Sequence, residues 1–91
     1  MKISFDQAKR DSTFHERGLA FEDAIEVFRG TTFEFIDDRA DYNEERIICF
    51  GFLSSRLVVV GYVMRGETRH IFSMRKANER ERKKIIPYFQ I

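Results

Sequence analysis

The stretch that decides the fold is residues 46–75, RIICFGFLSSRLVVVGYVMRGETRHIFSMR. Two apolar runs rich in β-branched and aromatic residues, 46–53 and 57–64, are joined at Ser54-Ser55, a pattern typical of a β-hairpin. The second run is apolar on both faces at its start, which places it centrally in a sheet. A polar turn then leads into a further strand at 68–75. Because tight connections favour antiparallel pairing, we expect an antiparallel meander.

A helix is expected near the N-terminus. The segment Ser4-Phe5-Asp6-Gln7 has the spacing of a capping box, in which the Ser4 hydroxyl accepts from the amide of Gln7. Asp6 is the alternative cap. The helix is predicted to run to about Arg17, and Gly18 ends it because glycine tolerates positive φ.

A second helix and a short strand follow. Apolar side chains recur at helical spacing from Phe21 to Phe28, forming one stripe for burial. Gly30 ends this helix. Alternating residues at 32–37 predict a short strand, and the polar, acidic stretch 37–43 reads as a loop.

The last element predicted is a helix that begins at Asn78. Asn78 stands three residues before Glu81, the spacing of a capping box. Pro87 should end or kink this helix, since proline lacks the amide hydrogen. The sequence therefore predicts a single α+β domain over residues 1–91, with two N-terminal helices, an antiparallel sheet and a C-terminal helix.

Charge is divided unevenly along the chain. Residues 1–45 carry 12 acidic and 6 basic side chains, whereas residues 46–91 carry 3 acidic and 10 basic ones. Such asymmetry indicates an anionic partner for the second half. The alternative is that the two halves neutralise each other across the fold.

Composition narrows the class of protein further. The single cysteine, Cys49, excludes a disulfide framework and a cysteine-based metal site, and it is expected to be an inert core residue. No signal peptide or membrane-spanning run is visible, which predicts a cytoplasmic protein with no membrane partner.

The last strand offers the clearest candidate site. Strict alternation assigns its side chains to two faces. The first face carries Arg69, Ile71, Ser73 and Arg75, and the second carries His70, Phe72 and Met74. The second face is expected to pack on the helices. The first would adjoin Arg65, Lys76 and Arg80 and form a basic surface suited to a phosphodiester backbone. The alternative is a solvated edge strand whose charges deter aggregation.

Other patterns carry weaker signals. His70 is expected to be a core or boundary residue and His15 a surface residue, although histidine is the usual acid or base near neutral pH. Asp37, Asp38 and Asp41 suggest an acidic loop more than a cation site. No glycine-rich phosphate loop, metal-ligand cluster or nucleophile elbow is present, so no metal or cofactor is expected.

The order and spacing of many residues resemble those of the BrnT family of toxins over nearly the whole chain. The matching positions are Phe5-Asp6, Lys9, Gly18, Phe21-Glu22-Asp23-Ala24, Val27-Phe28, Asp38-Arg39, Tyr42, Glu44, Arg46, Gly51, Val58 to Val60, Tyr62, Arg65-Gly66, Arg69, Ile71, Ser73, Arg75-Lys76-Ala77 and Glu81-Arg82. The resemblance implies a RelE-like fold and a metal-independent endoribonuclease that blocks translation. It also implies a BrnA-like antitoxin as partner, with operator DNA bound only through that antitoxin.

The roles of the candidate site residues are inferred partly from the resemblance and partly from the charges of their side chains. Four arginines would bind and polarise the scissile phosphate of RNA, with Lys76 assisting: Arg46, Arg65, Arg69 and Arg75. Glu44 is the predicted general base, and Tyr62 a proton donor or a platform for base stacking. Ser73 and Arg80 are expected to contact RNA. All of these roles require the arginines to converge on one patch.

The chain also departs from the family pattern. Thr13 replaces a usual asparagine, Glu16-Arg17-Gly18 a usual Lys-His-Gly, and Asn43 a usual glycine. Ile85 replaces a tyrosine of the last helix, although Tyr88 lies nearly one turn later. If the replaced tyrosine is needed for cleavage, the chain would lack that activity. The alternative function is a non-catalytic module that binds the antitoxin and acts in operon autoregulation.

Overall fold

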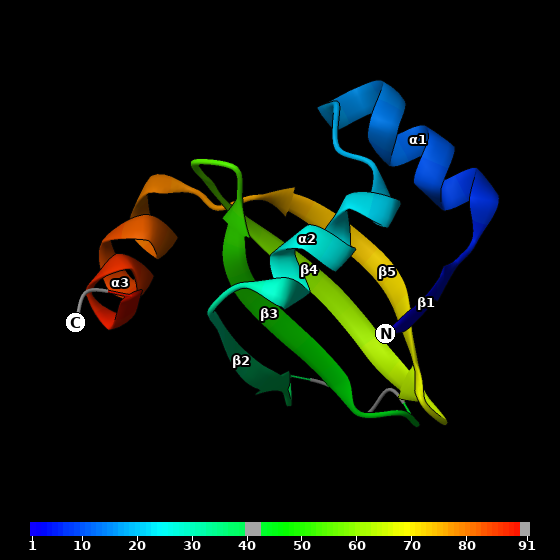
Figure 1. The fold of residues 1–91 in the computed structure, drawn as a ribbon. Coiled ribbons are helices and arrows are strands. Elements are labelled where there is room, and N and C mark those ends of the chain that lie inside the picture. Colours follow the sequence, from blue (N-terminus) through cyan, green and yellow to red (C-terminus); the bar gives the residue numbers. More distant parts are fainter. Residues whose placement is uncertain (40–42, 90–91) are drawn as a thin grey trace.

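The fold is a mixed five-stranded sheet with helices on both faces (Figure 1). The computed structural model describes residues 1–39 and 43–89. Its elements are β1 (Lys2–Phe5), α1 (Gln7–Arg17), a 3-10 turn η1 (Phe21–Asp23), α2 (Ala24–Arg29), β2 (Thr32–Asp37), β3 (Arg46–Leu53), β4 (Arg56–Arg65), β5 (Thr68–Lys76) and α3 (Glu79–Phe89). In this part of the chain no helix is long and apolar enough to cross a membrane.

The strand order within the described residues is β1-β5-β4-β3-β2. The antiparallel meander from β2 to β5 is confirmed, as is the α+β class. The first strand, β1, was not predicted and pairs parallel with β5. Residues 2–5 form a strand because Ile3 and Phe5 pack against the core. The cap of α1 is Asp6, whose Oδ1 accepts from the amide of Lys9 at 2.9 Å.

The predicted ends of the first two helices agree with the structure, but Phe21–Asp23, predicted as part of the second helix, forms the 3-10 turn η1, and α2 begins only at Ala24. Gly18 ends α1 with a φ of 70°. Asn78 and Glu81 form the predicted capping box, with reciprocal bonds of 2.9 and 2.8 Å. The prediction that Pro87 could end α3 is wrong, because the helix continues to Phe89. The Phe89 ring packs edge-on against two rings of the sheet, which holds this last turn in place.

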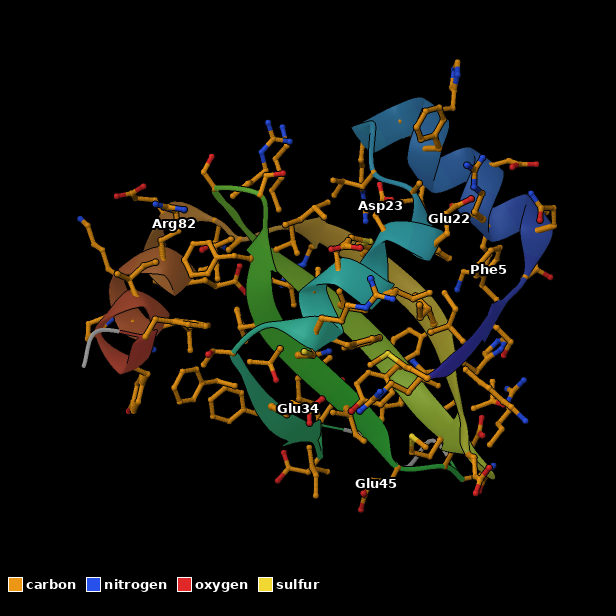
Figure 2. All side chains as sticks on the ribbon, viewed as in Figure 1. Phe5, Glu22, Asp23, Glu34, Glu45 and Arg82 are labelled. Atoms are coloured by element: carbon orange, nitrogen blue, oxygen red, sulfur yellow. The ribbon has the colours of Figure 1, made fainter. Side chains whose placement is uncertain are left out.

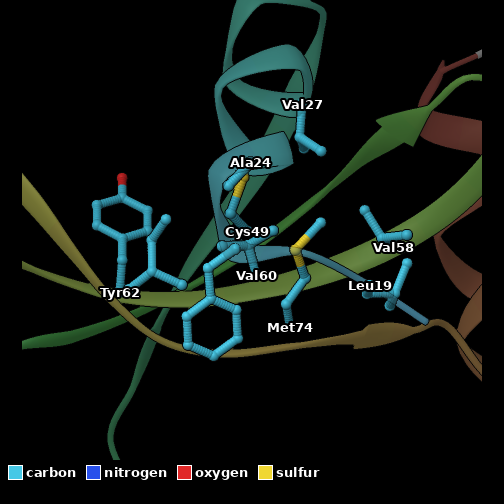
Figure 3. Close-up of a cluster of buried hydrophobic side chains, with 10 residues drawn as sticks. Leu19, Ala24, Val27, Cys49, Val58, Val60, Tyr62 and Met74 are labelled. Atoms are coloured by element: carbon cyan, nitrogen blue, oxygen red, sulfur yellow. The ribbon is translucent and has the colours of Figure 1, made fainter. Parts of the chain in front are cut away.

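Each face of the sheet has its own apolar cluster. On the face covered by α2, hereafter the helix face, Ala24 and Val27 pack on Cys49, Val60 and Met74 (Figure 3). On the opposite face, hereafter the open face, α3 covers a second cluster that consists of Phe50, Leu57, Val59 and Ile85. This second cluster lies towards one end of the strands, and α3 does not cover the row of side chains at the other end.

A β-bulge in β5 changes the predicted assignment of side chains to faces. Gly61 pairs with Ser73 and the next residue, Tyr62, pairs with Ile71, so Phe72 is the extra residue. A bulge breaks strict alternation. Ile71 and Met74, three residues apart, consequently both lie in the helix-face core.

The prediction that Arg69, Ile71, Ser73 and Arg75 share one face is therefore wrong. Arg69 stands opposite Met64 in a register that places it on the helix face, beside Phe28 of α2. Arg75 lies on the open face, where it bonds to Glu81 of α3. The reason is physical: the extra residue at Phe72 shifts the alternation of the later part of β5 by one position.

Gly61 makes this bulge possible. A Cβ atom at Gly61 would lie 2.5 Å from Ser73 Oγ and 2.7 Å from two carbons of the Phe72 ring. The missing side chain on β4 thus leaves the space into which two consecutive side chains of β5 project. A glycine inside a strand is a common companion of a bulge.

We predict that Gly61→Ala lowers the free energy of unfolding by about 1–3 kcal/mol, since the added methyl group overpacks the bulge. Urea unfolding followed by circular dichroism measures the change. Gly66→Asn is the matched control, because no atom lies within 4 Å of its Cβ position and asparagine accepts the φ of 63°. Equal unfolding midpoints for the wild type and Gly61→Ala would contradict this account of the bulge.

Candidate functional site

A row of polar side chains crosses the open face of the sheet. The strand registers place Ser4, His70, Val63, Arg46 and Asp37 side by side, one from each strand. Neighbouring strands lie about 4.8 Å apart, so the backbones at His70 and Arg46 are separated by roughly 10 Å. Val63 between them is buried, so His70 and Arg46 stand on either side of a covered position in the row.

His70 is held in this row by a residue of β1. Its Nδ1 lies 2.9 Å from the Ser4 hydroxyl, which either donates to this nitrogen or accepts from it according to the tautomer. Burial lowers the pKa of His70 below its usual 6.5, and the nearby positive charge of Arg65 lowers it further, against the opposing effects of Glu44 and Asp6. The neutral ring is therefore favoured near pH 7, and Nε2 is the nitrogen not engaged with Ser4.

Cationic and aromatic groups lie near His70 and Arg46 on the same face. The Arg46 guanidinium lies over the ring of Phe72, with its carbon 4.6 Å from the ring centroid. Arg65 Nη2 is 3.5 Å from Glu44 Oε1, an exposed ion pair. We call Glu44, Arg46, Arg65, His70 and Ser73 the open-face cluster.

Arg69 and Tyr62 belong to a different group on the helix face. The Arg69 guanidinium carbon lies 4.7 Å from the centroid of Phe28 and 5.5 Å from that of Tyr62. The Tyr62 hydroxyl donates to Glu34 of β2, labelled in Figure 2. Burial, followed by this bond to Glu34, raises the pKa of Tyr62 to about 12.

The prediction that Tyr62 and Arg69 act beside Glu44 and Arg46 is therefore wrong in geometry, because the sheet separates them. A phenol with a pKa of about 12 keeps its proton near neutral pH, and its hydroxyl is committed to Glu34. Within the described residues Arg69 Nε is buried without a hydrogen-bond partner. Arg69 and Tyr62 pack against Phe28 of α2, and they lie on the opposite side of the sheet from the open-face cluster.

Arg75 shares the open face but is held by α3. Its two terminal nitrogens donate to both Glu81 oxygens at 2.7 and 2.8 Å. This pairing raises the pKa of Arg75 and lowers that of Glu81. Lys76 is exposed and lies on the helix face by register, and Arg80 is exposed on α3. The predicted convergence of all four arginines does not occur, whereas Arg46, Arg65 and Glu44 do lie at one end of the open face.

Sequence reasoning missed His70, Ser4 and Phe72 as members of the site. Strict alternation assigned His70 to the apolar face, and the capping motif assigned Ser4 to a helix start. The one signal that could have corrected the first error is Gly61 in the facing strand, since a glycine inside a strand pattern suggests a bulge. Tyr42 and Asp41, which the sequence also singled out, lie outside the described residues. Among the described residues no three His, Cys, Asp or Glu side chains gather as metal ligands.

The fold and the cluster define a small α+β protein with arginine, histidine and carboxylate side chains on an uncovered sheet face. A scan against protein families matches residues 5–81 to the family described as the ribonuclease toxin, BrnT, of type II toxin-antitoxin systems. The chain belongs to the BrnT toxin family. A search of curated proteins gave no match.

We predict that Arg65→Gln raises the pKa of His70 and that Glu44→Gln lowers it. The first change removes a positive charge that disfavours the imidazolium, and the second removes a negative charge that favours it. An NMR titration of the His70 ring protons measures both shifts, and the wild-type value should lie below 6.5. Shifts of the same sign in the two variants would contradict the placement of His70 between these two residues.

Proposed function

We propose that the protein is a metal-independent endoribonuclease that cuts RNA on the open face of its sheet and thereby inhibits translation. The observation that carries this proposal is the row that places His70 of β5 and Arg46 of β3 on the same open face, with only β4 between them. Membership of a family of ribonuclease toxins supports it at the level of the activity class. A cytoplasmic location is part of the proposal, since that is where translation takes place.

The cleavage reaction requires only side chains of the open face and the 2′-hydroxyl of the RNA. The 2′-hydroxyl of the ribose loses its proton to a base and attacks the adjacent phosphorus. The bond to the 5′ oxygen of the next nucleotide breaks, and that oxygen takes up a proton. Arg46 and Arg65 would bind the phosphate and stabilise the charge that builds up on its oxygens.

His70 is better placed than Glu44 to be the base. A histidine that is neutral near pH 7 can accept a proton at its free nitrogen and return it to the leaving oxygen. Glu44 is exposed, and its carboxylate is paired with Arg65. Glu44 would then orient Arg65, and Ser4 would hold the imidazole ring.

The partner in this proposal is a BrnA-like antitoxin, and operator DNA is contacted only through it. An antitoxin is implied by the type II family. The outer strand β2 exposes about half of Phe35 and more of Ile36, and it offers backbone groups to which a partner strand could pair. This feature also favours the alternative function, a module that only binds the antitoxin.

We predict that Arg46→Ala and Arg65→Ala each reduce the rate of RNA cleavage by about 100-fold or more, because each removes a donor that stabilises transition-state charge. Arg56→Ala, which changes an exposed arginine at the start of β4, is the matched control and should cleave like the wild type. Cleavage of a labelled oligoribonucleotide by purified protein in EDTA measures these rates.

A substrate with a 2′-O-methyl group at the cut site completes the experiment, since it lacks the nucleophile. It should resist the wild-type enzyme, and unmethylated RNA should yield fragments with a 2′,3′-cyclic phosphate. Wild-type protein that leaves RNA intact at high concentration would refute the enzyme and favour the antitoxin-binding module. Full activity of Arg46→Ala would show that the site lies elsewhere.

A further inference from the structure

A groove runs between α1 and the outer edge of β5. The short strand β1 pairs only with Thr68–Ile71, so the edge of β5 from Phe72 onwards faces α1. Arg17 Nη1 donates to the backbone oxygen of Met74 at 3.0 Å and ties the end of α1 to this edge. Residues from one side of α1, among them Lys9, Ser12 and Glu16, form one wall of the groove, and Phe72 and Ser73 form the other.

A second depression continues the groove along the same edge. It is lined by Glu16, Arg17, Arg75 and Lys76, and it shares Glu16 and Arg17 with the first. Together the two depressions follow β5 from its bulge to its C-terminal end. The groove wall from Lys9 to Arg17 spans about 12 Å of helix.

The lining of this groove suits a polyanion. Lys9, Arg17 and Lys76 supply exposed cations, whereas Arg75 is paired with Glu81. Glu16 is the one acid among the lining residues of these two depressions. The Glu16 carboxylate accepts a bond of 3.3 Å from the Ser12 hydroxyl and is exposed. Exposed basic side chains along a groove are the usual way in which proteins follow a phosphate backbone.

The groove also connects with the open-face cluster. The Phe72 ring lines the groove and at the same time lies beneath the Arg46 guanidinium. Lys9 is close enough to contribute to the electrostatic environment of His70. A strand whose phosphate sits between His70 and Arg46 would therefore meet the groove at Phe72, without crossing the sheet.

We propose that this groove binds the single-stranded RNA that flanks the scissile phosphate. The inference rests on the proposed function, because it assigns the flanking nucleotides of the same substrate. Lys9 and Lys76, which line the two depressions of the groove, would each contact a different phosphate of the strand, and Phe72 would mark the junction between the groove and the cleavage site. Glu16 would weaken the binding, since its charge opposes that of the strand.

The test uses two substitutions with opposite expected effects. In a fluorescence titration with a fully 2′-O-methylated oligoribonucleotide, which cannot be cleaved, Lys9→Gln should weaken the affinity by about fivefold to tenfold, and Glu16→Gln should tighten it. The slope of log affinity against log salt should become shallower by about 0.7 for Lys9→Gln, the value for one lost contact to a single strand. The matched controls, Lys84→Gln on α3 and Glu26→Gln on α2, are exposed and lie outside the groove, so they should bind like the wild type.

The possible outcomes distinguish the failure of the groove from the failure of the proposed function. Unchanged affinity for both groove variants, with cleavage still dependent on Arg46, would overturn the groove and leave the proposed function standing. Equal effects of the groove and control substitutions would also overturn it, because they would show a non-specific charge effect. Wild-type protein that neither binds nor cleaves RNA would overturn both claims.

Discussion

One extra residue in β5, opposite the Gly61–Tyr62 step of β4, decides which side chains can act together. Before the bulge, His70 lies on the open face and Arg69 on the helix face. After it, Ser73 and Arg75 lie with His70, although strict alternation would have separated them. The composition of both the core and the candidate site depends on this single irregularity, which in turn depends on the missing Cβ of Gly61.

The two faces of the sheet differ in what they carry: the helix face carries packing contacts that stabilise the fold, and the open face carries the candidate site. On the helix face, the Arg69 guanidinium lies over the rings of Phe28 and Tyr62, and Tyr62 is bonded to Glu34 of β2. The polar groups there therefore join α2 to the sheet and β4 to β2. On the open face, α3 covers only one end of the strands, and the other end presents the polar row. This arrangement lets a chain of 91 residues keep two small apolar clusters and still expose a charged surface.

Most of the fold could be predicted from the sequence, because hydrophobic periodicity, capping residues and turn residues are local signals. The hairpins, the end of α1 at Gly18 and the capping box at Asn78 are examples. The strand β1 could not be predicted in this way, since it depends on a non-local parallel pairing with β5. The faces of the candidate residues could not be predicted, because alternation takes no account of a bulge. His70 lies on the open face and Arg69 on the helix face, the reverse of a placement on the apolar and basic faces of a regular strand.

The most direct test of the central claim is the map of NMR chemical-shift changes on titration of the protein with an uncleavable 2′-O-methylated RNA. The account predicts large changes at His70, Val63 and Ser73 on the open face, with small changes at Tyr62, Arg69 and Glu34. Changes concentrated around Arg69 and Tyr62, with His70 unaffected, would contradict it, because RNA would then bind on the face that the bulge assigns to the helices.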